Sequence, residues 1–419
     1  MLKIFFVFSL FVFSGCATYQ SKVASAKSEI INKNCDGAEE SLLQLSSEAG
    51  TDQLAYLMEF GTTLQICKKY EKSIQVLEQA EKLAEKIDYT SLSEVAVSTL
   101  LNEEFKSYKG DTFEKLFLNA SKALNFIELN KYDEALIEVR KMNQKFDKFK
   151  GEDKKSFELN SFSKYLSGLI WEATGKYDDA CIDYRGAFET NHTNSSENEI
   201  KHLSTQMLKA CWLAERSDEF KFLAKKTNLT LQEITDIKKE KSKSELVVLF
   251  LKGWGPQKKE NPVHPTFPYL VRNSMLTQKL KISITDQNQK ELGQFISQPF
   301  YSVAEAARLS LETDQAPLIE RRIAARVAKQ VVADQIRQKN AELGLAALIL
   351  MVGSEKADLR QWSFLPDSIH AIRVHLQPGS YTADVEGIGF NDTLTEKFES
   401  FTFTIEKKQK LIKSFRSLL

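Results

Sequence analysis

A two-helix unit that recurs in the first half of the chain is the feature that most constrains its fold. In the clearest copy, residues 162–191, apolar residues recur three and four positions apart on both sides of a Gly-Lys-Tyr turn at residues 175–177. This spacing places them on one face of each helix. The small residues Gly168, Ala180 and Ala187 allow the two helices to approach closely. Such a pair cannot bury its apolar face alone, so it must stack on neighbouring pairs.

Two weaker copies precede this one, at residues 54–87 and 116–149. Their turns repeat the same theme, Lys-Lys-Tyr-Glu-Lys at residues 68–72 and Asn-Lys-Tyr-Asp-Glu at residues 130–134. The unit resembles a tetratricopeptide repeat (TPR). The turn tyrosines are 62 and then 45 residues apart, against a repeat length of about 34, so we expect inserted helical material. Helices over residues 24–47 and 200–223 would cover the two ends of the stack.

Composition changes abruptly after a polar stretch at residues 236–245. Short alternating or β-branched runs predict strands, and two amphipathic runs predict helices at residues 303–313 and 317–340. The expected strands cover residues 246–251, 280–285, 370–376, 398–405 and 410–415. A Pro-Gly turn at residues 377–380 predicts a hairpin in which Arg373 pairs with Asp384. The predicted fold class is α+β, an N-terminal all-α TPR-like solenoid (residues 16–243) followed by a small β-sandwich or sheet domain with inserted helices (residues 244–419).

The N-terminus has the pattern of a lipoprotein signal peptide, residues 1–15. Lys3 precedes an apolar run at residues 4–13, and Ser-Gly leads into Cys16. The run is too short to cross a bilayer core, which needs about 20 residues. We therefore expect Cys16 to be the lipid attachment site and its acyl chains to hold the protein on the lipid bilayer. The alternative is an ordinary signal peptide with a chance cysteine.

Ala17, the residue after Cys16, favours the outer membrane by analogy with the enterobacterial sorting rule. We expect the protein to face the periplasm, although exposure on the cell surface is the other arrangement. Four more cysteines then lie in a compartment that permits disulfides, Cys35, Cys67, Cys181 and Cys211. The favoured interpretation is that Cys67 and Cys181 are buried free thiols in helices. If one bridge forms, Cys35–Cys67 is the expected one.

Charge and motifs exclude several classes of function. Lys+Arg and Asp+Glu are equal, at 57 each, so no nucleic-acid partner is predicted. The chain lacks a zinc-helix histidine spacing and a Gly-x-Ser-x-Gly elbow, and we predict no catalytic residue, cofactor or metal. His370 and His375 fall on opposite faces of one strand. The polar run at residues 358–362 either binds an anion or, as we prefer, ties the helix end near Gly353 to the sheet.

The first helix of each TPR-like pair should line the concave side of the stack. Some residues expected there are more apolar than a solvated surface would carry, which suggests a groove for a peptide or helix of another envelope protein. The alternative is that they pack beneath the inserted helices. The candidate groove residues are Phe117, Leu124, Ile127, Phe162, Tyr165, Leu169 and Glu172.

The arrangement resembles a family of Gram-negative lipoproteins that join divergent TPRs to a β-containing C-terminal domain. Residues 130–140, 165–173, 357–366 and 376–381 carry the resemblance. It implies envelope localisation and a scaffolding role, with no catalytic residues to carry over, so we expect a protein-protein interaction scaffold and not an enzyme. The alternatives are an envelope enzyme with its site in the C-terminal half and a surface-exposed adhesive lipoprotein.

Overall fold

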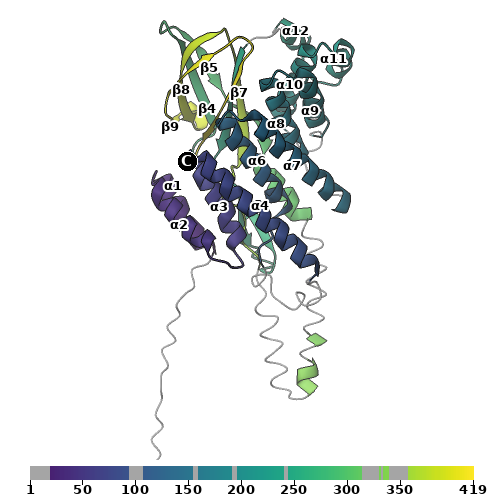
Figure 1. The fold of residues 1–419 in the computed structure, drawn as a ribbon, viewed down its shortest axis with the longest axis vertical. Helices are drawn as coiled ribbons and strands as arrows, with labels where there is room; N and C mark the ends of the chain where they lie inside the picture. Colours follow the sequence, from purple (N-terminus) through teal and green to yellow (C-terminus); the bar gives the residue numbers. More distant parts are fainter. Residues whose placement is uncertain are drawn as a thin grey trace, which may run out of the picture.

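The described part of the helical half is a stack of helical hairpins, five in number by their helix bounds (Figure 1). The computed structural model describes residues 19–93, 107–153, 159–190, 196–239, 244–313, 330–331, 334–338 and 357–419. The hairpins are α1 (Tyr19–Ile31) with α2 (Cys35–Ser47), α3 (Gln53–Ile66) with α4 (Tyr70–Ser93), α6 (Thr112–Glu128) with α7 (Tyr132–Asp153), α8 (Leu159–Ala173) with α9 (Tyr177–Thr190), and α10 (Glu197–Leu213) with α11 (Ser217–Ala224). A last helix, α12 (Leu231–Lys239), packs on α10.

All five hairpins turn in the same way. The first helix ends at one residue with a left-handed backbone, and these residues are Lys33, Lys68, Asn130, Gly175 and Glu215. The next residue donates its N–H to the carbonyl five positions back, as in the bonds from Lys69 to Leu64 and from Lys176 to Trp171, both 2.8 Å. This is the Schellman ending of a helix. The turns predicted at residues 68–72, 130–134 and 175–179 are confirmed, and each expected end cap is itself a hairpin.

The C-terminal half is a β-sandwich. The central sheet has the order β11-β1-β7-β6, in which β1 and β11 are parallel, and the outer sheet has the order β10-β8-β4-β5 with β9 also on β8. A separate hairpin joins β2 and β3. The strands are β1 (Ser244–Lys252), β2 (Gln257–Glu260), β3 (Pro268–Val271), β4 (Lys279–Asp286), β5 (Glu291–Ile296), β6 (Gln298–Ser302), β7 (Ser368–Leu376), β8 (Gly379–Ile388), β9 (Leu394–Lys397), β10 (Phe401–Ile405) and β11 (Lys410–Arg416).

The central sheet is buried on both faces. On β1, Leu246, Val248 and Phe250 pack against the outer sheet, whereas Val247 and Leu249 pack in a core that they share with the helices. The near-continuous apolar run of β1 follows from this double burial. Residues 303–313 form the predicted helix, and the one predicted at residues 317–340 lies mostly outside the described residues. Within the described ranges, no helix is both long and apolar enough to span a bilayer.

The predicted hairpin between residues 370–376 and 381–385 is wrong in its pairing. The turn is present, but it carries the chain from the central sheet to the outer one, so β7 pairs with β1 and β6 while β8 pairs with β4. Arg373 lies opposite Val247, and Asp384 lies opposite Ser283. The apolar residues of both strands were predicted correctly. They face each other across the core between the two sheets instead of lying side by side on one sheet.

Two disulfides fasten the ends of the helical stack. Cys35–Cys67 joins α2 to the end of α3, as expected for a single bridge, and Cys181–Cys211 joins α9 to α10. The interpretation of Cys67 and Cys181 as free thiols is therefore wrong. An end hairpin packs on only one neighbour. Each bridge ties such a hairpin to that neighbour.

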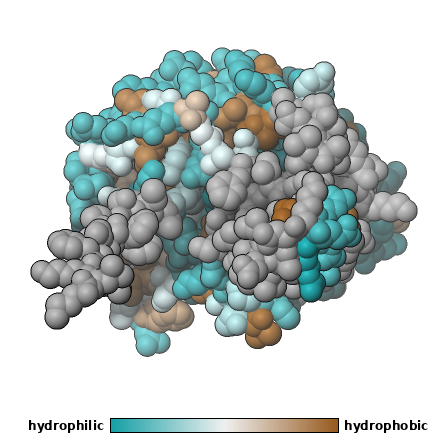
Figure 2. Space-filling model, turned by 90° about the horizontal axis from the view of Figure 1, so that it is seen from below, coloured by the Kyte–Doolittle hydropathy of each residue, from teal (hydrophilic) through white to brown (hydrophobic). Residues whose placement is uncertain are grey.

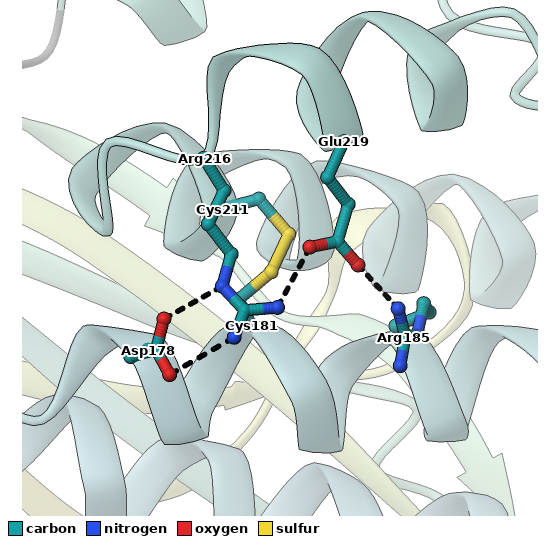
Figure 3. Close-up of a disulfide and its surroundings, with 6 residues drawn as sticks. All are labelled: Asp178, Cys181, Arg185, Cys211, Arg216 and Glu219. Carbon is teal, nitrogen blue, oxygen red and sulfur yellow. Dashed lines mark hydrogen bonds and ion pairs between the residues drawn. A yellow bond between two sulfur atoms is a disulfide. The ribbon is translucent and has the colours of Figure 1, made fainter.

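Ion pairs reinforce the second bridge (Figure 3). The Arg216 guanidinium donates to both carboxylate oxygens of Asp178, at 2.6 and 2.9 Å, and to Glu219 at 2.7 Å. Glu219 also accepts from Arg185. These partners come from α9, α11 and the turn between α10 and α11, so they hold the last hairpin on the same neighbour as the disulfide does.

Removing the second bridge should destabilise the protein. The cysteines are 30 residues apart, and closing a loop of this length stabilises a fold by about 3 to 4 kcal/mol. We expect the double variant Cys181→Ala and Cys211→Ala to unfold at lower urea concentration, measured by circular dichroism. The matched control is Cys35→Ala with Cys67→Ala, at a separation of 32, which should show a similar loss. An unfolding midpoint insensitive to a reductant would contradict both bridges.

Candidate functional site

The β domain of the same chain fills the concave side of the helical stack. All seven predicted groove residues are buried, and none is more than 6% exposed. The expected open groove for another protein is therefore not present. The cover includes strands β6 and β11, which contact α10 and α6. The residues are Phe117, Leu124, Ile127, Phe162, Tyr165, Leu169 and Glu172.

Aromatic rings from β6 replace the expected partner. The ring of Tyr301 lies 5.0 Å from that of Phe162 and 6.2 Å from that of Phe117, centroid to centroid. Phe300 lies 4.2 Å from Tyr165. The apolar character of the concave residues is thus explained by burial inside the chain. The sequence analysis considered a foreign peptide or inserted helices as the cover of these residues, whereas the structure places a strand there.

A buried cluster of charges joins the helices to the central sheet. Glu172 of α8 and Glu245 of β1 are fully buried. The Arg373 guanidinium lies 2.7 Å from Glu172 and 3.0 Å, through Nε, from Glu245. Lys410 lies 3.2 Å from Glu172 and 2.6 Å from Glu245, and Lys209 of α10 lies 3.3 Å from Glu245. Two carboxylates are therefore enclosed by three cations.

The cations determine the charge state of these carboxyl groups. Burial alone would raise the pKa of Glu245, but Arg373, Lys410 and Lys209 hold it well below its usual value. Burial likewise opposes the ionisation of Glu172, and Arg373 and Lys410 outweigh it, so that its pKa is lowered. Both carboxylates are ionised at neutral pH and act as counterions.

A second pair of buried carboxyl groups holds the loop at residues 358–365. Glu59 of α3 accepts hydrogen bonds from the backbone N–H groups of Ser363 (2.7 Å) and Phe364 (2.9 Å). Glu114 of α6 accepts one from the N–H of Trp362 (2.6 Å). Burial raises the pKa of each to about 7, with Asp111 adding to the effect at Glu114. Sequence reasoning missed both, although an acidic residue inside an apolar helical run is a signal of such a role.

The polar run at residues 358–362 is structural. Arg360 pairs with Asp358 at 2.7 Å and with Asp52 at 3.1 Å, and the Trp362 indole donates to the Thr62 hydroxyl at 2.7 Å. The run is tied to α3 through Thr62 and to α6 through Glu114, whereas Glu59 holds the two residues that follow it. Gly353, where we expected the tie, lies outside the described residues.

The described residues contain no group of three or more His, Cys, Asp or Glu side chains placed to hold a metal ion. The cavity beside Glu114 and Lys258 has a volume of about 10 Å³, which suffices for one water molecule at most. His370 lies in the core between the sheets, and His375 lies near Lys209 and Glu245, so the two occupy opposite faces as predicted.

A larger groove lies between α2, α3 and α4. It has a volume of about 440 Å³. Its apolar residues come from all three helices, and polar residues from the same helices complete the lining. We call it the α2–α4 groove. It is lined by Leu43, Ser46, Ser47, Gln53, Leu57, Phe60, Val76, Gln79 and Leu83.

Exposed apolar side chains also gather where β8 turns into β9. Phe390 is 73% exposed, Leu276 65% and Leu394 53%. Their segments meet at Ile388, which pairs with Leu394 and accepts a hydrogen bond of 2.8 Å from the N–H of Gln278, two residues after Leu276. We call these three residues the β8–β9 patch. By contrast, the face in Figure 2 shows hydrophobic groups scattered among hydrophilic ones.

No family model matches the chain, and no curated protein is significantly similar to it in sequence. Solved structures resemble its helical half. Nearly identical TPR-like repeats from Podosopora anserina are 14% identical over 52% of this chain and 94% of that chain, with a TM-score of 0.35. BtubC from P. vanneervenii is 10% identical over 52% and 79%, with a TM-score of 0.37.

A tetratricopeptide repeat protein from Parabacteroides merdae is 15% identical over 53% of this chain and 97% of that chain, with a TM-score of 0.15. Scores of this size carry no argument about function. The TPR-like description of the helical half rests on its own hairpins and their common turn.

Acid should weaken the interface between the helices and β6. His202 is half-buried, and its Nε2 lies 2.9 Å from the Tyr165 hydroxyl. Loss of water around the ring, with the charge of Arg373, lowers its pKa to about 3. The unfolded chain binds this proton near pH 6.5. Stability is therefore complete above pH 6.5 and is lost as the pH falls toward 3, by about 2 kcal/mol between pH 7.5 and 5.

His202→Gln retains a hydrogen-bonding side chain but does not titrate, so it should lose less stability over this pH range than the wild type. Urea unfolding at pH 7.5 and at pH 5 measures the difference. His264→Gln, at an exposed histidine, is the control and should follow the wild type. An unchanged pH dependence in His202→Gln would refute this role of His202.

Proposed function

We propose that the protein is a lipid-anchored envelope protein that binds other proteins through its helical half. Cys16 is the attachment site, and Ala17 supports a place at the outer membrane, on its periplasmic side. Two disulfides between consecutive hairpins suit an oxidising compartment outside the cytoplasm. The TPR-like hairpins are an architecture that presents extended binding surfaces.

The α2–α4 groove is the binding surface that the geometry favours. The concave side is filled by the chain itself, which leaves the outer side of the hairpins for a partner. Leu43 is 51% exposed at the groove, whereas Leu57 and Phe60 are buried beneath it. A groove between helices that offers apolar side chains beside polar ones fits an amphipathic peptide or helix from another protein. This groove is the observation that carries the proposed binding function.

The two rival functions have less support. For an enzyme, the strongest groups are the buried carboxyl groups Glu59 and Glu114, but both are hydrogen-bonded to the loop that they hold. For a surface adhesin, the structure offers the β8–β9 patch as an exposed apolar feature. The protein-binding proposal joins the groove, the disulfides and the anchor in one account.

The anchor has a direct test. A radiolabelled fatty acid fed to cells that express the full chain should label the protein, and Cys16→Ala should abolish the label because the thiol is the acceptor. The variant should also leave the membrane fraction. Label that persists in Cys16→Ala would place the lipid elsewhere and overturn the assignment.

The groove has a test of its own. A photo-crosslinking amino acid in place of Gln79, which lines the groove, should give a discrete crosslinked protein in envelopes of the native cells. Leu43→Asp should reduce that product at least fivefold, because a charge would enter the apolar surface. The matched control is Ile137→Asp, at a residue of α7 that is 50% exposed, and it should have no effect. If Phe390→Asp removed the product and Leu43→Asp did not, the β8–β9 patch would be the binding surface instead.

A further inference from the structure

The start of α1 is fastened to the folded protein from its first residue. Tyr19 is 8% exposed. Its hydroxyl donates to Glu59 at 3.0 Å and to the carbonyl of Gln361 at 2.5 Å. The side chain of Gln20 donates to the carbonyls of Lys258 in β2, at 3.0 Å, and Leu359, at 3.4 Å. These bonds join α1 to α3, to the loop at residues 358–365 and to β2.

The distance from this point to Cys16 is limited by covalent geometry. Only two residues, Ala17 and Thr18, separate Cys16 from Tyr19. Whatever their conformation, three Cα steps span about 11 Å at most. If Cys16 is acylated, as the proposed function holds and as this inference requires, Tyr19 remains within about that distance of the lipid headgroups. The folded protein then cannot turn this end away from the bilayer.

The β2–β3 hairpin is the neighbour of that end. Gln20 bonds directly to Lys258 in β2, and β2 pairs along its length with β3. Lys258 is itself held inward by an ion pair with Asp111 at 2.7 Å. The base of the hairpin is therefore fixed beside Tyr19 and, through it, close to Cys16.

The turn at the tip of the hairpin is ordered by hydrogen bonds and exposes an apolar side chain. The Asn261 side chain accepts hydrogen bonds from the N–H groups of Val263 (2.9 Å) and His264 (3.1 Å). Val263 is 75% exposed, and Tyr269 on β3 is 39% exposed. Tyrosine favours the membrane interface, where its ring is partly buried and its hydroxyl stays wet. A formed turn presents these side chains without a cost of ordering a loose loop.

We propose that the β2–β3 hairpin rests on the bilayer surface, with Val263 and Tyr269 among the lipid headgroups. The ligand is the lipid surface itself. The short chain between Cys16 and Tyr19 keeps this end of the protein, and not another, against the bilayer. The protein is thereby held in one orientation instead of tumbling on a flexible linker.

A depth measurement tests this contact in the full-length lipidated protein. Val263→Cys, labelled with an environment-sensitive dye, is compared with Leu231→Cys in vesicles of phosphatidylethanolamine and phosphatidylglycerol that contain a lipid-bound quencher. The four cysteines in disulfides do not compete for the dye. Leu231 is the matched control because it is 85% exposed and lies in α12, at the top of Figure 1, well away from α1. Quenching should be at least threefold stronger at residue 263.

A second variant separates the tether from the hairpin. Ten Gly and Ser residues inserted between Thr18 and Tyr19 should leave the protein on the vesicles but lower the quenching at residue 263 toward that at residue 231. Protein that fails to float with the vesicles would overturn the anchor and so the proposed function. Protein that floats but shows equal quenching at the two positions would overturn the hairpin contact alone.

Discussion

Glu172 and Glu245 are two carboxylates with no access to solvent, and they make the two halves of this protein depend on each other. One comes from a helix and the other from the first strand, and both depend on Arg373 and Lys410 in strands β7 and β11. Breaking a buried ion pair by removing one partner costs about 3 to 5 kcal/mol, because the remaining charge has lost its compensation. The helices without the sheet would leave Glu172 without its cations. The helical stack and the sandwich are therefore one folding unit, which agrees with the core that they share.

Because the two halves depend on each other, the concave surface of the helical repeats is used inside the chain. In an open stack, the concave side is available to a partner, but here the aromatic residues Phe300 and Tyr301 of β6 occupy it. The chain uses the recognition surface of its own repeats to hold its own sheet. A partner of the helical half must then approach from the outer side, where the α2–α4 groove lies. The repeats act both as scaffold for the sandwich and as the support of a different surface.

Local patterns in the sequence predicted the local structure well. The turns at residues 68, 130 and 175 follow from a short motif, and the apolar faces of β7 and β8 follow from alternation. The predictions that failed concern contacts between segments that are far apart in the sequence. A Pro-Gly turn looks the same whether the next strand pairs with the last or crosses to another sheet, so the Arg373 pairing was assigned to the wrong residue. Glu172 is one of the predicted groove residues, but its role as a counterion depends on Arg373, which lies 201 residues away in β7.

Helix α3 connects these features because it is buried on every side. Its Glu59 accepts a hydrogen bond from the Tyr19 hydroxyl, next to the proposed anchor, and others from the N–H groups of Ser363 and Phe364, which belong to the loop before β7. The adjacent residue, Phe60, lines the α2–α4 groove together with Leu57. A rigid helix cannot move one of these contacts without the others. Helix α3 therefore links the groove to the residues beside the proposed attachment point. If Cys16 is that point, a partner bound in the groove would be held at a constant height above the membrane.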